Sequence, residues 1–159
     1  MASLKITPIE KGKSLQLLFE GRIDEDATFP KLGPNFSEIT IDWSGVKAIN
    51  SCGIREWLRW IGGVPHTTSV KYTNCSRIIV NQINMIDGFL PRGGKVESFF
   101  VPYYCEPCES ITSLLFSHKK EPTQQPQTPP ATAECETCKR PAELDVVGSS
   151  YFRFLKGAY

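Results

Sequence analysis

The chain lacks the features that mark membrane, exported and nucleic-acid-binding proteins. No apolar run approaches the roughly 20 residues that a membrane helix needs. The first residues contain no apolar core of the length found in signal peptides. The formal net charge is only +1, which gives no electrostatic footprint for nucleic acid or for an anionic membrane surface. These absences predict a cytoplasmic protein that does not engage a membrane.

Common catalytic motifs are missing as well. The sequence has no glycine-rich phosphate loop and no arrangement of Ser or Cys with His from which nucleophilic catalysis could be argued. Its 40% hydrophobic and 22% charged residues are typical of a soluble globular protein, and 159 residues allow one well-cored domain with a small appendage. We therefore expect a protein that is not an enzyme.

Strand and helix patterns alternate along the first two-thirds of the chain. We predict strands at residues 4–9, 14–20, 38–43, 67–73 and 95–103, helices at 51–62 and 76–90, and a short helical turn capped by Asp24 or Asp26. Strands that alternate with helices favour parallel pairing through right-handed crossovers. The fold class is therefore α/β, with a mixed, largely parallel sheet covered by helices.

The pattern changes after residue 103. We predict a strand at 111–118, a flexible loop rich in Pro, Gln and Thr at 119–134, a short strand around 144–147, and a short C-terminal helix at 149–156. The prediction is thus a domain at 1–103 and a small extension at 104–159. The apolar end of the chain would be an aggregation hazard if exposed, so we expect it to pack on the extension or on the main domain.

Small polar residues gather at the start of the helix predicted at 51–62. Asn50, Ser51 and Cys52 meet unpaired backbone amides and the positive end of the helix dipole there. Such a position can hold an anion or carry a phosphoryl group, which makes Ser51 a candidate phosphorylation site. The simpler interpretation is that Ser51 only caps or begins the helix. Cys52 has a redox-sensor interpretation, but a lone Cys followed by Gly is more often a small packed residue.

Three segments of the first domain form an ordered set of motifs. They are Gly21-Arg-Ile-Asp24, the strand Ile39-Thr-Ile-Asp42, and Trp43-Ser-Gly-Val-Lys-Ala-Ile-Asn-Ser-Cys-Gly53. In this order, residues 4 to about 103 resemble a STAS domain, the module of anti-sigma-factor antagonists and of the cytoplasmic region of sulfate transporters. The resemblance implies a STAS-like sheet and a non-enzymatic signalling or adaptor protein.

The resemblance also implies a site. In regulatory STAS domains, a partner kinase phosphorylates the first Ser of an Asp-Ser-Ser-Gly segment, and this decides which partner binds. Ser51 occupies that position, while Asn50 replaces the Asp and Cys52 replaces the second Ser. The implied partners are an anti-sigma-type serine kinase, a serine phosphatase or a sensor protein. The implied partner-binding surface consists of Asp24, Asn50, Ser51 and Gly53. Asn50 keeps the capping ability of Asp and loses its charge, so phosphorylation of Ser51 stays an open question.

Four of the six cysteines form two Cys-x-x-Cys pairs, Cys105 with Cys108 and Cys135 with Cys138. Two thiolates on one tight turn can both reach an ion at about 2.3 Å, and two such pairs around a hairpin-sized segment predict a structural Zn²⁺ site with four thiolate ligands. The arrangement resembles a zinc ribbon. Glu109 and Lys139 stand where the turns of such ribbons usually have Gly.

Other interpretations of the cysteine pairs remain. Two disulfides are disfavoured because the chain has no export signal. A thioredoxin-like redox motif stays a minor alternative, because the first pair follows a strand as such motifs do. His66 and His118 are not needed as ligands. Zinc ribbons often contact nucleic acid, so a nucleic-acid-associated adaptor is the alternative function. The mixed charges of the extension argue against a basic patch, and we do not expect nucleic acid as the partner.

Overall fold

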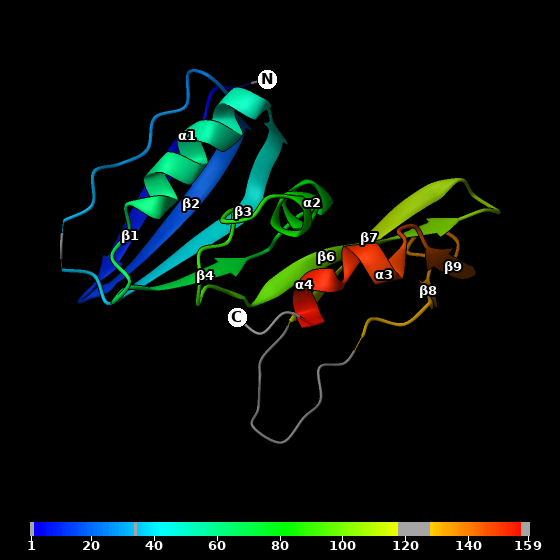
Figure 1. The fold of residues 1–159 in the computed structure, drawn as a ribbon. Coiled ribbons are helices and arrows are strands. Elements are labelled where there is room, and N and C mark those ends of the chain that lie inside the picture. The colour runs from blue at the N-terminus through cyan, green and yellow to red at the C-terminus, as the bar shows by residue number, and fades with distance from the viewer. Residues whose placement is uncertain (1, 34, 118–127, 157–159) are drawn as a thin grey trace.

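Two β-sheets lie end to end in the computed structural model, which describes residues 2–33, 35–117 and 128–156 (Figure 1). The first sheet has the order β1 (Lys5–Lys11), β2 (Ser14–Ile23), β3 (Glu38–Ile49), β4 (Ser69–Thr73), β5 (Lys95–Val96). The second has the order β7 (Ser110–Ser117), β6 (Ser98–Cys105), β9 (Pro141–Leu144), β8 (Thr132–Glu134). The helices are α1 (Ser51–Gly62), α2 (Arg77–Met85), α3 (Gly148–Tyr151) and α4 (Arg153–Lys156). Among the described residues, no helix is both long and apolar enough to cross a bilayer.

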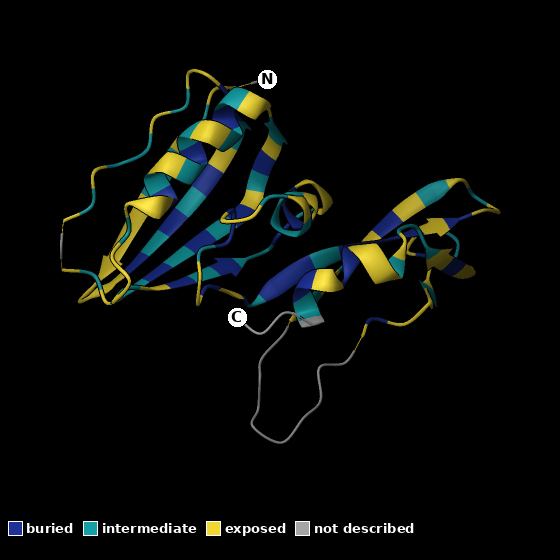
Figure 2. Cartoon of the chain, viewed as in Figure 1, coloured by how far each residue is buried: buried dark blue, intermediate teal, exposed yellow. Residues whose placement is uncertain are grey.

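The first sheet confirms the predicted α/β class with a mixed, largely parallel sheet. β1 runs antiparallel to β2, and the pairs β2–β3, β3–β4 and β4–β5 are all parallel. Side chains alternate between the two faces. Leu17, Ile41 and Tyr72 lie opposite one another and are fully buried, whereas Thr40 and Lys71 on the other face are only half-buried. This alternation shows as bands along the strands in Figure 2.

Aromatic side chains fix α1 on the apolar face of this sheet. The ring of Trp57 lies 5.0 Å from that of Trp43 and 5.7 Å from that of Phe19, both edge to face. The indole N–H of Trp57 and the hydroxyl of Tyr72 both donate to the carbonyl oxygen of Phe89, at 3.1 and 2.6 Å. Such aromatic pairs contribute about 0.5–1.5 kcal/mol each beyond their burial. The orientation of α1, and with it the position of Ser51, therefore depends on a packed core.

The prediction that the third strand ends at Trp43 is wrong. β3 continues to Ile49, because two register shifts against β2 let it bend past Ser44 and Gly45 and resume pairing. A Cβ on Gly45 would lie 2.6 Å from the carbonyl oxygen of Phe19, so the bent strand needs glycine at this point. α1 itself has the predicted bounds and follows β3 after the single residue Asn50.

The short helix predicted after β2 is absent from the described residues of this segment. A turn forms at 24–26 and an extended strap follows to β3. The side chain of Asp24 accepts from the backbone N–H of Asp26 at 3.0 Å, and the carbonyl of Asp24 accepts from Ala27 at 3.0 Å. Asp24 therefore caps a turn, and Pro30 in the strap disfavours continuation as a helix.

Two other predicted elements differ in the structure: a helix is shorter than predicted, and a strand is divided in two. The helix predicted at 76–90 ends at Met85, because Ile86 is extended and Gly88 has a φ of +86°. The strand predicted at 95–103 becomes β5 and β6, which belong to different sheets. Ser98 marks the change of sheet, since its hydroxyl accepts from the backbone N–H of Asn74 at 2.7 Å. The predicted domain boundary at residue 103 thus falls inside a strand of the second sheet.

The C-terminal extension also differs from its predicted elements. Residues 132–134, predicted as loop, form β8, and the strand expected around 144–147 lies at 141–144 as β9. The positions of both strands are set by pairing, because β8 pairs with β9 and β9 pairs with β6. The helix predicted at 149–156 is split into α3 and α4 at Phe152. Residues 119–127, the larger part of the predicted loop, lie outside the described residues, as does residue 118 at the end of the strand predicted at 111–118.

The C-terminal helices join the extension to α2, where the two sheets meet (Figure 1). Tyr151, Phe152 and Phe154 are buried, as predicted for the apolar end of the chain. The side chain of Asn84 donates to the carbonyl of Tyr151 at 2.8 Å and accepts from the backbone N–H of Phe154 at 3.1 Å. One amide side chain of α2 therefore holds both short helices.

Removal of the Asn84 amide tests this joint. We expect Asn84→Ala to lower the free energy of unfolding by about 1–3 kcal/mol, because two backbone groups lose their partner. Asn81→Ala, at an exposed position one turn earlier in α2, is the matched control and should change it by less than about 0.5 kcal/mol. Urea unfolding measures both. Equal effects of the two substitutions would contradict the role given to Asn84.

Candidate functional site

The four cysteines of the Cys-x-x-Cys pairs meet at the far end of the second sheet. Their sulfur atoms all lie within 4.8 Å of one another. Cys105 and Cys135 are fully buried, while Cys108 and Cys138 are half-buried. The first pair occupies the turn between β6 and β7, and the second occupies the turn between β8 and β9. The structure therefore brings together all four residues predicted as metal ligands.

The spacing of the sulfur atoms suits a tetrahedral ion. Contacts cross between the two turns, with 3.4 Å between the sulfurs of Cys105 and Cys138 and 3.5 Å between those of Cys108 and Cys135. A tetrahedron with metal–sulfur bonds of about 2.3 Å has edges of about 3.8 Å. Four thiolates at this spacing could hold one metal ion and leave no coordination position to solvent or substrate.

The two cysteine turns share an unusual backbone feature. The residue after the second cysteine, Glu109 in one turn and Lys139 in the other, has a left-handed φ of 54° or 64°. Gly adopts this conformation without strain, which is why it is common at this point of such turns. The sequence lacks Gly there, yet the backbone keeps the conformation at both equivalent positions. The two cysteine turns therefore share this backbone conformation.

Hydrogen bonding and burial shift the pKa values of two of the cysteine thiols in opposite directions. Ser110, followed by the backbone amide of Cys138, stabilises the thiolate of Cys135 and lowers its pKa to about 5. For Cys105, a backbone hydrogen bond from Cys108 favours the thiolate, but burial and the neighbouring thiols outweigh it and raise the pKa to about 12. The thiolate of Cys135 is therefore favoured at neutral pH, and a metal ion that binds Cys105 would have to displace the proton of that thiol.

Ser110 was not predicted as a member of this site. Its hydroxyl lies 3.0 Å from the sulfur of Cys108 and 3.4 Å from that of Cys135, so it touches one ligand from each turn. Ser110 pairs with Cys105 across the β6–β7 hairpin. The sequence feature that could have identified Ser110 is its position two residues after Cys108, where a strand begins.

The second candidate site is the loop at the start of α1. Asn50 is the N-cap, and its side-chain oxygen accepts from the backbone N–H of Gly53 at 2.8 Å. Its side-chain amide donates to the carboxylate of Glu25 at 3.0 Å, and this hydrogen bond lowers the pKa of that carboxyl. Ser51 is the first helical residue and is exposed. The capping role thus belongs to Asn50, which leaves the Ser51 hydroxyl free of that task.

Two of the predicted surface residues lie beneath the loop. Asp24 is only 3% exposed and holds the guanidinium of Arg22 and the backbone of Asp26. Gly53 is also buried, and a Cβ at this position would overlap the carbonyl of Ile23. Asp24 and Gly53 therefore support the loop from below, while Asn50 and Ser51 form its surface.

The electrostatic surroundings of Ser51 are mixed. The first turn of α1 carries no acidic residue, so the helix dipole favours an anion there. The carboxylates of Glu25 and Asp26 are exposed on the neighbouring turn, and their negative charge disfavours an anion at the start of α1. On the other side, the guanidinium of Arg55 lies 3.9 Å from the Cys52 sulfur and adds positive charge one turn along the helix.

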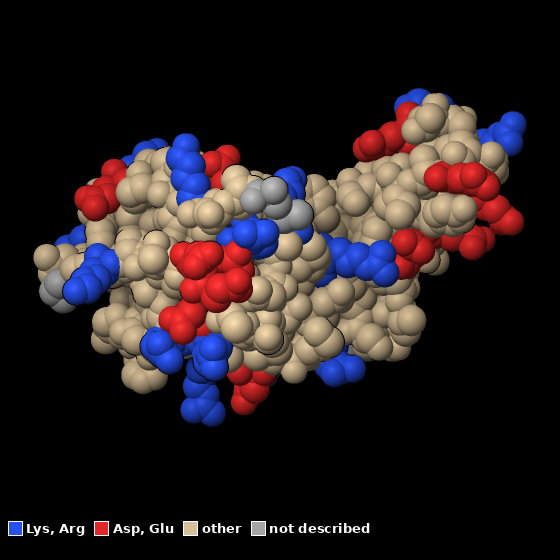
Figure 3. Space-filling model, turned by 90° about the horizontal axis from the view of Figure 1, so that it is seen from above, with Lys and Arg blue, Asp and Glu red and all other residues tan. Residues whose placement is uncertain are grey.

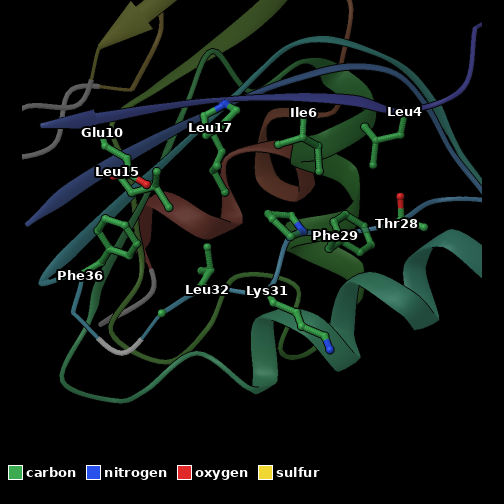
Figure 4. A pocket seen from close by; sticks show the side chains of 13 residues that line it. Leu4, Ile6, Glu10, Leu15, Leu17, Thr28, Phe29, Lys31, Leu32 and Phe36 are labelled. Atoms are coloured by element: carbon green, nitrogen blue, oxygen red, sulfur yellow. The ribbon is translucent and has the colours of Figure 1, made fainter.

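A cleft of about 460 Å³ with a mixed polar and apolar lining lies between the β1–β2 edge and the strap that precedes β3 (Figure 4). Leu4, Ile6 and Leu17 form its sheet side, and Phe29 and Leu32 close it from the strap. The cleft is separate from both candidate sites.

No protein-family model matches this chain, and no curated protein sequence matches it.

The left-handed turn residues give a test of the paired cysteine turns. We expect Glu109→Gly and Lys139→Gly each to raise the free energy of unfolding by about 1 kcal/mol, because strain in the left-handed region is removed. Glu109→Val should lower it, since a β-branched side chain tolerates this region least. Glu106→Gly, in the same turn with a negative φ, is the control and should not stabilise. Thermal unfolding would contradict the assignment if all three glycine variants behaved alike.

Proposed function

We propose that this chain is a non-enzymatic signalling or adaptor protein that binds partner proteins through a STAS-like α/β domain. The observation that carries the proposal is the α1 start, where Asn50 caps the helix and Ser51 is exposed above buried Asp24 and Gly53. This is the arrangement that a partner-binding loop needs, because its surface is polar and its support is rigid. From β1 to α2, the order of strands and helices is the one predicted from the sequence, except for the short helical turn after β2.

Phosphorylation of Ser51 is the proposed switch. A phosphoryl group there adds close to two negative charges at the positive end of α1. Because Glu25 lies beside the same loop, the added charge would also strain the contact between Glu25 and Asn50. Both effects change the surface that a partner meets. A serine kinase of the anti-sigma type would add the group, and a serine phosphatase or a sensor protein would respond to it.

Intact-mass analysis of the protein from its own cell tests the switch. We expect one phosphoryl group on the wild type under at least one growth condition and none on Ser51→Ala. Ser44→Ala, at an exposed serine in β3, is the matched control and should keep the modification. Affinity capture with wild-type, Ser51→Ala and Ser51→Asp baits should then recover different partners. Unmodified protein in all conditions together with identical partner sets would overturn the switch.

A structural Zn²⁺ ion in the four-cysteine cluster is the second part of the proposal. The donor set is all thiolate and tetrahedral in spacing, which suits Zn²⁺ and also iron. Full ligation by protein favours a structural role over catalysis. Bound in this way, the ion would link the β6–β7 and β8–β9 turns as a zinc ribbon does.

Metal analysis tests this part. We expect about one zinc ion per chain in protein purified without oxygen or chelator, because four protein ligands bind a structural ion tightly. Cys108→Ser should lose most of the metal and unfold at a lower temperature. Cys52→Ser, a free cysteine of α1 outside the cluster, should keep both the metal and the stability. Iron in place of zinc, or the same metal content in both variants, would contradict the assignment.

The charges around the cluster favour a protein partner over nucleic acid. Glu106, Glu109, Glu134 and Glu136 surround the two turns, against Lys139 and Arg140. Phosphate contacts need clustered Lys and Arg. In the view of Figure 3, acidic and basic side chains are interspersed at the projecting end of the molecule, and no continuous basic patch is seen there. A nucleic-acid-associated adaptor is therefore the weaker alternative.

A further inference from the structure

The hydroxyl of Ser110 lies between the two cysteine turns. It is 3.0 Å from the sulfur of Cys108 and 3.4 Å from the sulfur of Cys135, and it is the first residue of β7. The β6–β7 hairpin sets this place, because Ser110 lies opposite Cys105 in the register. A serine hydroxyl has one proton to donate, and a thiolate is an acceptor. Ser110 can therefore hydrogen-bond to either of two candidate ligands.

A second hydroxyl on the same strand serves a different partner. Thr112 lies two residues further along β7, on the same face, and is 3% exposed. Its hydroxyl oxygen accepts from the backbone N–H of Glu136 at 3.3 Å. One side chain of β7 thus contacts sulfur atoms, and its neighbour contacts only the backbone of the second turn. This difference provides an internal control.

We propose that Ser110 is a positioning residue of the metal centre, whose hydroxyl donates to a metal-bound thiolate and so tightens metal binding and protects the sulfur. The proposal rests on the metal site proposed above. A hydrogen bond withdraws electron density from the thiolate, which makes the sulfur less nucleophilic. It also fixes the orientation of the ligand, and outer partners of this kind typically change metal affinity 10–100-fold.

Two isosteric variants separate the hydroxyl from the shape of the side chain. Ser110→Thr keeps the hydroxyl and adds a methyl group, whereas Ser110→Val has the shape of threonine with a methyl group in place of the hydroxyl, so the two variants differ from each other only in the hydroxyl. Both residues suit a strand, so both variants should fold. The full chain is reconstituted with Co²⁺ without oxygen, and affinity is measured by competition with a chelator. The sulfur-to-cobalt charge-transfer band and the rate of alkylation by iodoacetamide report on the thiolates directly.

We expect Ser110→Val to bind Co²⁺ about tenfold or more weakly, to shift the charge-transfer band, and to be alkylated several-fold faster. Ser110→Thr should restore all three properties towards the wild type. Thr112→Val should lower stability and leave the band unchanged, since its hydroxyl touches no sulfur. A wild-type band and alkylation rate in Ser110→Val would overturn the proposal while the metal site stands. A wild-type protein that takes up no metal would overturn the site itself.

Discussion

The convergence of four thiols on one point is the constraint on which the second sheet depends. The β8–β9 hairpin has strands of only three and four residues, and it joins β6 through two residue pairs. Pairing of this length is marginal in water. Contacts of 3.4 and 3.5 Å between sulfur atoms of the two cysteine turns add a second connection at the tip of the sheet. A metal ion held by all four sulfur atoms would strengthen that connection.

The other end of the second sheet is held by ordinary packing. Phe99 of β6 stacks edge to face with Phe154 at 5.0 Å, and Tyr151 donates to the carbonyl of Phe100. An ion pair of 3.3 Å between Arg77 and Asp145 adds little, because both side chains are open to solvent in part, with 51% and 37% exposed. The small sheet is thus fastened by apolar burial near the main domain and by thiols at its tip.

Sequence patterns predicted the parts that depend on local chemistry. α1 has its predicted bounds because its capping residue, its apolar spacing and its two terminal glycines are all local signals. The metal ligands were predictable because each Cys-x-x-Cys pair forms its own turn. β3 could not be predicted beyond Trp43, since the bulges that extend it depend on pairing with β2. The division of residues 95–103 between two sheets likewise depends on tertiary contacts of Ser98.

The Ser51 loop shows the same limit at the level of single residues. The STAS resemblance implied one site for Asp24, Asn50, Ser51 and Gly53, and these residues lie close together in the structure. Which of them face solvent depends on how closely α1 approaches the end of β2, and no local pattern reports that distance. Glu25 was overlooked because its contact with Asn50 spans 25 residues.

The central claim is that four thiolates hold one structural zinc ion and so give the small sheet its shape. X-ray absorption at the zinc edge of the purified full chain measures it most directly. The account predicts a first shell of four sulfur atoms at about 2.3 Å. A shell that contains nitrogen or oxygen, or fewer than four sulfur atoms, would contradict it.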